Sequence, residues 1–150
     1  MTHGPHFGLL DNRFLARSVG LLDPGAPLTI REDDSLGRAL TVLRDNKVGC
    51  VVVTAANGEL KGIFTERDVL LKLDFKQLDE TRPIREFMTA HPRTVEMTAP
   101  IAFVLQLMSE GGFRHVPIID EERLPVGIVS VKDIIDYIVS SVTKDLHSFE

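Results

Sequence analysis

GIFTERDVLLKL, residues 62–73, and GIVSVKDIIDYI, residues 127–138, follow one pattern at two places 65 residues apart. Each stretch runs from a glycine through two apolar residues to a hydroxyl residue, and then through two variable residues to an aspartate and another apolar pair. With the same offset, residues 19–73 align with residues 84–138 without a gap. An internal repeat of this kind predicts two related structural units that pack on each other.

The two repeats agree in their apolar pattern more than in identity, since only seven aligned positions hold the same residue. Early in each repeat, apolar residues recur at a spacing of 0, 3, 4 and 7, which is typical of one face of an α-helix. Ser35 precedes the first such helix as a good N-cap residue, and Pro100, which a first turn tolerates, stands at the aligned position. The residues of this face are Leu36, Ala39, Leu40 and Leu43 in the first repeat, and Ile101, Val104, Leu105 and Met108 in the second.

Each repeat is predicted to fold as helix, strand, strand, helix, after a short extended piece at residues 28–30 or 93–95. Short β-type runs place the strands at residues 48–53 and 62–64 in the first repeat, and at 113–119 and 127–129 in the second. The fold class is therefore α/β (α+β), with two small sheets packed on helices. The second helices are expected to bury Val69, Leu70 and Leu73 in the first repeat, and Ile134, Ile135 and Ile138 in the second.

The repeat divides the chain into five parts. An N-terminal extension, residues 1–18, precedes the first repeat, residues 19–73, and a polar linker, residues 74–83, leads to the second repeat, residues 84–138, and a tail, residues 139–150. We expect the chain to cross between the repeats over the linker. One repeat of this size buries too little surface to be stable alone, so the two are expected to share a core.

The composition disfavours several classes of function. With 43% hydrophobic and 26% charged residues among 150, the chain suits one domain or two small interlocked ones. Its net charge of −5 argues against a general affinity for nucleic acid or acidic membranes. No apolar run approaches the ~20 residues that a membrane helix needs, and the N-terminus lacks the pattern of a signal peptide.

Cys50 is the only cysteine, so no intrachain disulfide can form. Its apolar surroundings, CVVV, predict a buried and inert thiol, and we expect a reducing, cytoplasmic setting. His3 and His6 are metal-ligating residue types, but a solvated terminus without metal is the expected interpretation, because no other ligands are near them in the sequence.

The repeated phrase admits two interpretations. Thr65-x-x-Asp68 and Ser130-x-x-Asp133 have the form of a capping box, in which the hydroxyl accepts a hydrogen bond from an early helix N–H and the acid reaches back. The same geometry suits a ligand, since a helix start favours phosphate, a hydroxyl can donate to it, and a carboxylate one turn later can accept from both hydroxyls of a ribose. Its occurrence twice at the same place favours a binding site for a sugar phosphate.

The phrases GIFTERD and GIVSVKD, the lead-ins PLTI and PRTV, and the segments IREFMTAHPRTV and FRHVPIID occur in one order and spacing. In these features residues 19–138 resemble a tandem pair of CBS domains, also called a Bateman module. The resemblance implies two repeats related by a pseudo-twofold axis. It also implies two clefts that commonly take AMP, ADP or ATP, and sometimes S-adenosylmethionine.

The resemblance also implies roles for individual residues. Asp68 and Thr65 would hold ribose and phosphate in one cleft, and Asp133 and Ser130 would do so in the other. We expect unequal clefts, because the repeats differ at Arg114-His115 and at Glu66, and we expect the cleft of Asp68 to bind better. The other implied contacts are Thr29, Ile30, Thr94 and Val95 for adenine; Arg114, His115 and Lys132 for phosphate in the cleft of Asp68; and Lys47 and Arg67 for phosphate in the cleft of Asp133.

No catalytic set is recognisable in the sequence, so we do not expect an enzyme. The leading hypothesis is a free-standing module that senses adenosine nucleotides as regulatory ligands and signals to a client enzyme or transporter, or through a homodimer. The helix after Asp133 could contribute to a dimer face. Two alternatives stay open: a ligandless scaffold for dimerisation or docking, and a sensor of cations or S-adenosylmethionine.

Overall fold

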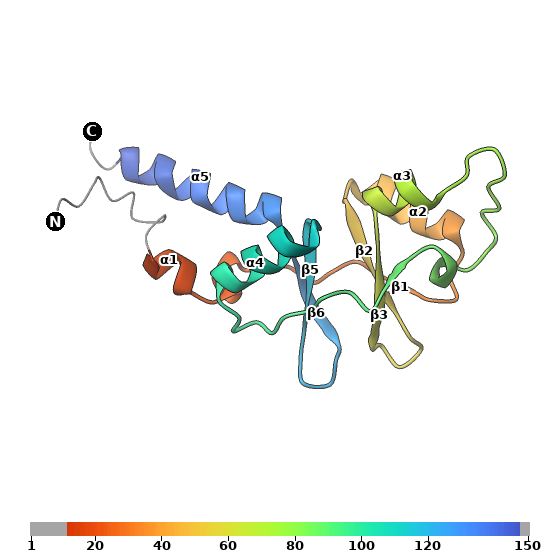
Figure 1. Ribbon diagram of the computed structural model, residues 1–150, viewed down its shortest axis with the longest axis horizontal. Helices are drawn as coiled ribbons and strands as arrows, with labels where there is room; N and C mark the ends of the chain where they lie inside the picture. The colour runs from red at the N-terminus through yellow and green to blue at the C-terminus, as the bar shows by residue number, and fades with distance from the viewer. Residues whose placement is uncertain (1–11, 148–150) are drawn as a thin grey trace.

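The computed structural model describes residues 12–147, and both repeats have the expected order of helix, strand, strand, helix (Figure 1). The first repeat contains β1 (Thr29–Arg31), α2 (Leu36–Asn46), β2 (Cys50–Thr54), β3 (Leu60–Thr65) and α3 (Glu66–Lys72). The second contains α4 (Ile101–Gly111), β5 (His115–Ile119), β6 (Pro125–Ser130) and α5 (Val131–His147). The predicted mixed fold is confirmed. His3 and His6 lie outside the described residues.

Two sheets form the centre of the molecule. The first has the order β1-β2-β3-β4, where β4 is Thr89–Ala90, β1 runs parallel to β2, and the other neighbours are antiparallel. The second is the antiparallel pair β5-β6. Val95 bridges Ile118 in parallel, as Ile30 pairs with Val53 in the first sheet, so the extended lead-in is shorter in the second repeat.

The first helix of each repeat begins and ends at aligned positions. The Ser35 hydroxyl accepts a hydrogen bond from the backbone N–H of Arg38 at 3.1 Å, which confirms the predicted N-cap of α2. Lys47 and Gly112 follow α2 and α4, and both have left-handed backbones, with φ of 53° and 69°. Glycine adopts this conformation without steric cost, whereas a lysine in it is strained.

The prediction that the second helices bury Leu70 and Ile135 is wrong. Leu70 is 76% exposed and Ile135 is 51% exposed, whereas Leu73 and Ile134 are buried. Successive helical residues are rotated by about 100°, so only one side of each helix contacts the sheet. Leu70 and Ile135 therefore lie beside the buried face.

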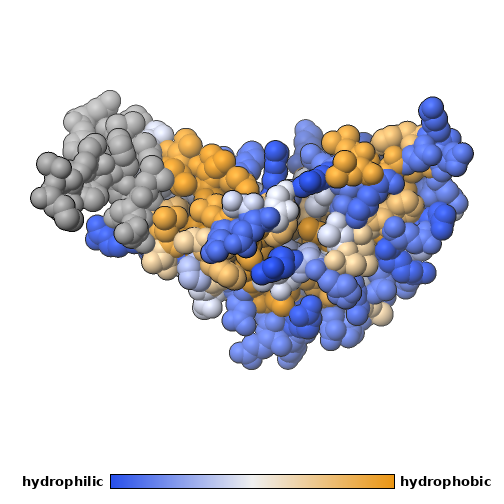
Figure 2. Space-filling model, viewed as in Figure 1, coloured by the Kyte–Doolittle hydropathy of each residue, from blue (hydrophilic) through white to orange (hydrophobic). Residues whose placement is uncertain are grey.

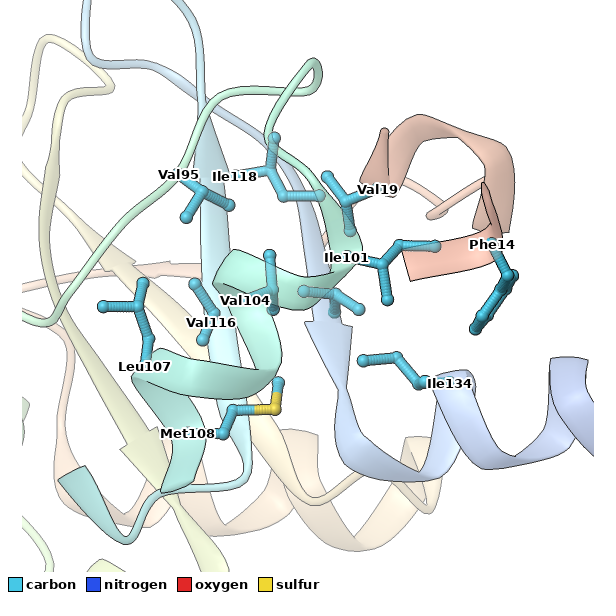
Figure 3. Packing of buried hydrophobic residues seen from close by; sticks show 11 residues of the cluster. Phe14, Val19, Val95, Ile101, Val104, Leu107, Met108, Val116, Ile118 and Ile134 are labelled. Atoms are coloured by element: carbon cyan, nitrogen blue, oxygen red, sulfur yellow. The ribbon is translucent and has the colours of Figure 1, made fainter. Parts of the chain in front are cut away.

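Each repeat has its own apolar core. In the second repeat, α4 lies between β5 and the start of α5, and Ile134 approaches Ile101 from α5 (Figure 3). Phe14 of α1 (Asn12–Ala16) joins this core and stacks on Tyr137, with ring centroids 5.8 Å apart. The buried core of the first repeat consists of Ile30, Leu36, Ala39, Leu43, Val51, Val53, Phe64, Leu73 and Ile84.

The short helices that begin the two repeats are exchanged between them. Val19, in the short helix η1 (Val19–Leu22), packs in the core of the second repeat, and its N–H donates to the carbonyl of Ala99 at 2.7 Å. Ile84, in η2 (Ile84–Glu86), packs in the core of the first repeat, and its N–H donates to the carbonyl of Asp34 at 2.7 Å. Val19 and Ile84 are 65 residues apart, so the exchange obeys the symmetry of the repeat and locks the two units together.

The prediction that the chain crosses over residues 74–83 is wrong. Ile84 still belongs to the first core, and β4 still pairs with β3. The backbone N–H of Val95 then donates to the carbonyl of Pro117 in the second repeat at 3.1 Å. The crossing therefore lies between β4 and Val95, because the apolar anchor Ile84 holds the preceding chain on the first repeat.

The two sheets meet in a third apolar cluster. Cys50, Val52, Leu60 and Ile63 of the first sheet pack with Ile119 and Ile128 of the second. The helices of each repeat lie outward from this contact, and α5 extends away from the first repeat (Figure 1). Within residues 12–147, no helix is both long and apolar enough to cross a membrane.

Candidate functional site

Two clefts lie where the sheets of the repeats meet, and both are lined by residues of both repeats. The large cleft has a volume of about 900 Å³ and the small cleft about 410 Å³. The small cleft is lined by Gly49, Ile63, Thr65, Glu66, Arg67, Leu70, Gly112, Phe113, Arg114 and His115. The large cleft is lined by residues 26–28, 47–50, 66, 114, 115, 128, 130–133 and 135.

The clefts are related by the symmetry of the repeat. Each residue that lines the small cleft has its counterpart, 65 positions away, on the wall of the large cleft. Glu66 and His115 line both clefts, and the large cleft has two features that the small one lacks, which are the segment 26–28 and Asp133. Their counterparts, residues 91–93 and Asp68, do not line the small cleft. The sequence repeat therefore produces two related but unequal clefts.

Asp133 is available to a ligand. One carboxylate oxygen, Oδ2, accepts a hydrogen bond from the backbone N–H of Ser130 at 2.9 Å. The Ser130 hydroxyl oxygen accepts from the N–H of Asp133 at 3.0 Å. These bonds cap α5, as the capping-box pattern predicts, yet both side chains line the large cleft. Within the described chain, the Ser130 hydroxyl donates to no protein acceptor and Oδ1 of Asp133 accepts no hydrogen bond.

The carboxylate of Asp68, unlike that of Asp133, is fully engaged by neighbouring side chains and backbone. It is 5% exposed, and its Oδ2 accepts from both the backbone N–H and the hydroxyl of Thr65, at 3.0 and 3.2 Å. Its Oδ1 accepts from the Thr89 hydroxyl at 2.9 Å and pairs with the Lys72 ammonium at 3.0 Å. Both carboxylate oxygens are thus engaged, and the Thr65 hydroxyl has used its hydrogen. The geometry is opposite to the expectation that the cleft of Asp68 binds better.

The cations are distributed differently from the sequence expectation. Lys47 and Lys132 line the large cleft, Arg67 lines the small one, and Arg114 lines both, so Arg114 does reach the cleft of Asp68 as expected. We expect the reverse for Lys132 and Arg67 from the sequence, but each lies in the first turn of the helix after its own cap and stays at that cap's cleft. Lys132 pairs with Asp136 at 2.9 Å. Arg67 donates to the carbonyl of Gly112 at 2.6 Å.

The side chains of Lys47 and Arg114 are available to pair with a ligand. Among the described residues, neither forms an ion pair or a side-chain hydrogen bond, and both line the large cleft. The guanidinium of Arg114 is suited to paired hydrogen bonds with phosphate oxygens. The large cleft thus combines two available cations with the available Ser130 hydroxyl and Asp133 carboxylate.

The residues expected at adenine do not line either cleft. Ile30 is buried in the first core, and Thr29 and Ile30 border a separate hollow of about 450 Å³ beside Asp34 and Thr54. Val95 is buried in the second core, and neither Thr94 nor Val95 is on the walls of the two clefts. The segment 26–28, directly before β1, takes this place in the large cleft. Sequence reasoning missed Ala26 and Leu28, because the sequence alone does not show that these apolar residues before β1 are exposed at a cleft.

His115 and Cys50 stand at aligned positions, and their pKa values are shifted in opposite directions. Burial lowers the pKa of the half-buried His115 below its usual range; Asp133 and Glu66 oppose this shift, and Arg114 adds to it. Burial, with a smaller contribution from Asp68, raises the pKa of Cys50 to about 12. The thiol is therefore protonated at neutral pH, and the prediction of a buried cysteine is confirmed.

Val19 and Ile84 each pack in the core of the other repeat, and the two clefts are related by the same symmetry. The chain is therefore a pseudo-symmetric module of two repeats. Residues 24–74 and 84–140 each match the CBS domain family model, and the chain belongs to the CBS domain family, with two copies in tandem. The resemblance noted in the sequence is thereby confirmed.

Solved structures share this fold. The CBS domain pair of protein MJ0100, in complex with 5-methylthioadenosine and S-adenosyl-L-methionine, is 27% identical, with a TM-score of 0.72 over 80% of this chain and 98% of that chain. The CBS-domain protein ATU1752 from Agrobacterium tumefaciens is 31% identical, with a TM-score of 0.71 over 81% of this chain and 98% of that chain.

Curated relatives are of different lengths. The uncharacterized protein MJ1404 of Methanocaldococcus jannaschii is 36% identical in an alignment of 124 residues that covers 74% of this chain but only 29% of that protein. An uncharacterized 17.7 kDa protein of Acidianus ambivalens is 28% identical over 120 residues, which are 80% of this chain and 72% of that protein.

Proposed function

We propose that this CBS pair binds an adenosine nucleotide in the large cleft and acts as a regulatory module rather than as a catalyst. One observation carries the proposal: in the large cleft an open Asp133–Ser130 pair faces the available cations Lys47 and Arg114. A ribose needs an acceptor and a phosphate needs donors and positive charge, and this wall offers both.

The arrangement suggests an orientation for the ligand. The base would lie against Leu28 and Ile128, which are among the apolar residues of the wall. The ribose hydroxyls would donate to Asp133 at the first turn of α5. The phosphate would accept from Ser130, near the positive end of the α5 dipole, and pair with Lys47 and Arg114.

The relatives support the adenosine class. The CBS pair of MJ0100 was solved with 5-methylthioadenosine and S-adenosyl-L-methionine, and both molecules contain adenosine. The available cations of the large cleft favour a ligand with a phosphate over either of those two molecules. Ligand binding would then shift the arrangement of the repeats, or of two chains, only by the difference in affinity between the two states.

We also propose that two chains associate through α3 and α5, so that the ligand signal passes through the dimer or through a separate client protein. Leu71 of α3 and Val139 of α5 are exposed and lie on neither cleft. Figure 2 shows apolar surface over both helices along the same edge of the molecule. The two apolar areas are separated by hydrophilic surface, and exposed apolar surface of this kind is typical of an interaction site; it is also the observation that favours a ligandless scaffold.

The cation-sensor alternative has less support. Within the described part of the chain, no three histidine, cysteine or acidic side chains are placed to hold a metal ion. The acids of the large cleft, Glu66 and Asp133, are accompanied by three cations. A regulatory metal site would need more oxygen ligands than this wall supplies.

Isothermal titration calorimetry with AMP, ADP, ATP and S-adenosyl-L-methionine tests the proposed function. We expect binding of at least one nucleotide with one dominant site per chain, and weaker binding of S-adenosyl-L-methionine. A ligand at 100 times its Kd should also stabilise the fold by about 2.7 kcal/mol in thermal unfolding. If no adenosine compound binds while the protein self-associates, the scaffold hypothesis replaces the sensor.

A further inference from the structure

The two clefts share part of their walls. Gly49, Glu66, Arg114 and His115 line both the large cleft and the small cleft. By contrast, Asp133 and the segment 26–28 line the large cleft and not the small one. The four shared residues therefore mark the inner end of the large cleft, where it meets its neighbour, and Asp133 marks the part that faces away.

Glu66 places a negative charge at this inner end. Its side chain is exposed, and among the described residues it takes part in no ion pair. A Cβ added to Gly49 would lie 3.4 Å from Oε1 of Glu66 and 3.5 Å from Nε2 of His115, so the carboxylate and the imidazole flank the same glycine. The backbone N–H of Glu66 donates to the carbonyl of Gly49 at 3.0 Å, which ties α3 to this point.

The second repeat has no charge equivalent to that of Glu66, and within residues 12–147 no cation pairs with this carboxylate. The residue 65 positions later is Val131, so the second repeat offers no carboxylate at the equivalent point. The titratable and charged groups that act on His115 are Asp133, Glu66 and Arg114, and burial lowers the pKa of the imidazole. At neutral pH His115 is therefore mainly uncharged and leaves the carboxylate of Glu66 negative.

The proposed orientation directs the phosphates toward Glu66. A nucleotide with its ribose at Asp133 would carry its phosphate toward the shared residues, where Arg114 lies. Lys47 and Arg114 together match the charge of one phosphate group, about −2. A second or third phosphate would extend further along the shared wall and would bring its charge to the carboxylate of Glu66.

We infer that Glu66 is a specificity-determining residue that makes the large cleft select adenosine monophosphate over the di- and triphosphate. The inference rests on the proposed function and adds to it which nucleotide the module reads. Like charges in close contact oppose binding, and we expect a preference of about tenfold for AMP over ATP in the absence of divalent cations.

Calorimetric titration of AMP and ATP into the full chain in EDTA tests the inference. EDTA is needed because a divalent cation could bridge a phosphate and Glu66. The variant Glu66→Gln removes the charge and keeps the shape, and we expect it to reduce the preference to about twofold by tightening ATP binding while AMP changes little. The control is Glu121→Gln, which makes the same change of net charge in the exposed turn before β6, away from both clefts.

Each outcome decides the inference. If the unmodified protein binds ATP as tightly as AMP, or if Glu66→Gln changes both affinities equally, Glu66 does not select and the inference is overturned while the proposed function stands. If no nucleotide binds, the proposed function fails and the inference fails with it. Should Glu66→Gln not fold, as judged by its thermal unfolding, Glu66→Val provides the side chain that the second repeat already carries at this position.

Discussion

Asp68 and Asp133 occupy the same position in the two repeats, but only Asp133 faces a cleft. Asp68 is enclosed by Thr65, Thr89 and Lys72, which engage both of its carboxylate oxygens. Thr89 belongs to β4, and the described part of the second repeat has no such added strand beside β6. An extra pair of residues in one sheet thus converts one copy of a repeated motif into a structural anchor.

The first prediction separates these two roles. Asp133→Asn should weaken AMP binding at least about tenfold, because the ribose loses a charged acceptor, and should cost only about 1 kcal/mol of unfolding free energy as a weakened cap. Asp68→Asn should lower the unfolding free energy by about 1–3 kcal/mol, since a buried and paired charge is removed, and should change the AMP affinity less than threefold. Urea denaturation and calorimetry on both variants provide the comparison, and equal losses of affinity would show that the assignment of roles is mistaken.

The second prediction concerns the strained backbone of Lys47. Lys47→Gly should raise the unfolding free energy by about 0.5–1 kcal/mol, because glycine adopts a φ of 53° without steric cost. The same substitution should weaken AMP binding several-fold, since one available cation leaves the large cleft. Lys47→Ala is the matched control: it removes the same charge but keeps the strain, so it should weaken binding without stabilising the fold. A Lys47→Gly protein that binds AMP with unchanged affinity would exclude Lys47 from the site.

The third prediction is a pH dependence of stability. Because burial lowers the pKa of His115 in the folded protein, the unfolded chain takes up a proton first as the pH falls through the unfolded value of about 6.5. The unfolding free energy should therefore decrease between pH 7 and pH 5.5. His115→Gln should flatten this decrease, whereas His91→Asn, at an exposed histidine, should leave it in place. Denaturation curves at a series of pH values measure the slope, and an identical slope in the His115→Gln protein would contradict the prediction.

The fourth prediction addresses self-association. Lysine at both Leu71 and Val139 should convert the proposed dimer to a monomer, since two charges would enter an apolar contact. Ala102→Lys, on the exposed side of α4, is the control and should not change the association. Light scattering after size-exclusion chromatography gives the mass directly. A dimer that survives the double substitution would have to use another surface.

Much of the fold could be predicted from the sequence because its signals are local. The helical spacing of Leu36 and Leu43, the cap at Ser35 and the alternation of strands and turns depend on neighbouring residues, and the structure confirms them. The predictions for Leu70 and Ile135 failed because an apolar residue in a helix does not reveal which side of the helix meets the sheet, and that depends on tertiary packing.

The sequence by itself determined that there are two repeats, their register, and the hydroxyl-to-aspartate caps that begin α3 and α5, because these depend on residues close together in the chain. Only the tertiary structure decided that the short helices at Val19 and Ile84 are exchanged between the repeats. It also decided that Thr89 and Lys72 enclose Asp68, and that Lys47 and Arg114 line the same cleft as Asp133. The physical reason is that burial and charge pairing depend on which distant segments meet, and two aligned aspartates with the same local sequence pattern acquire different partners when the sheets around them differ.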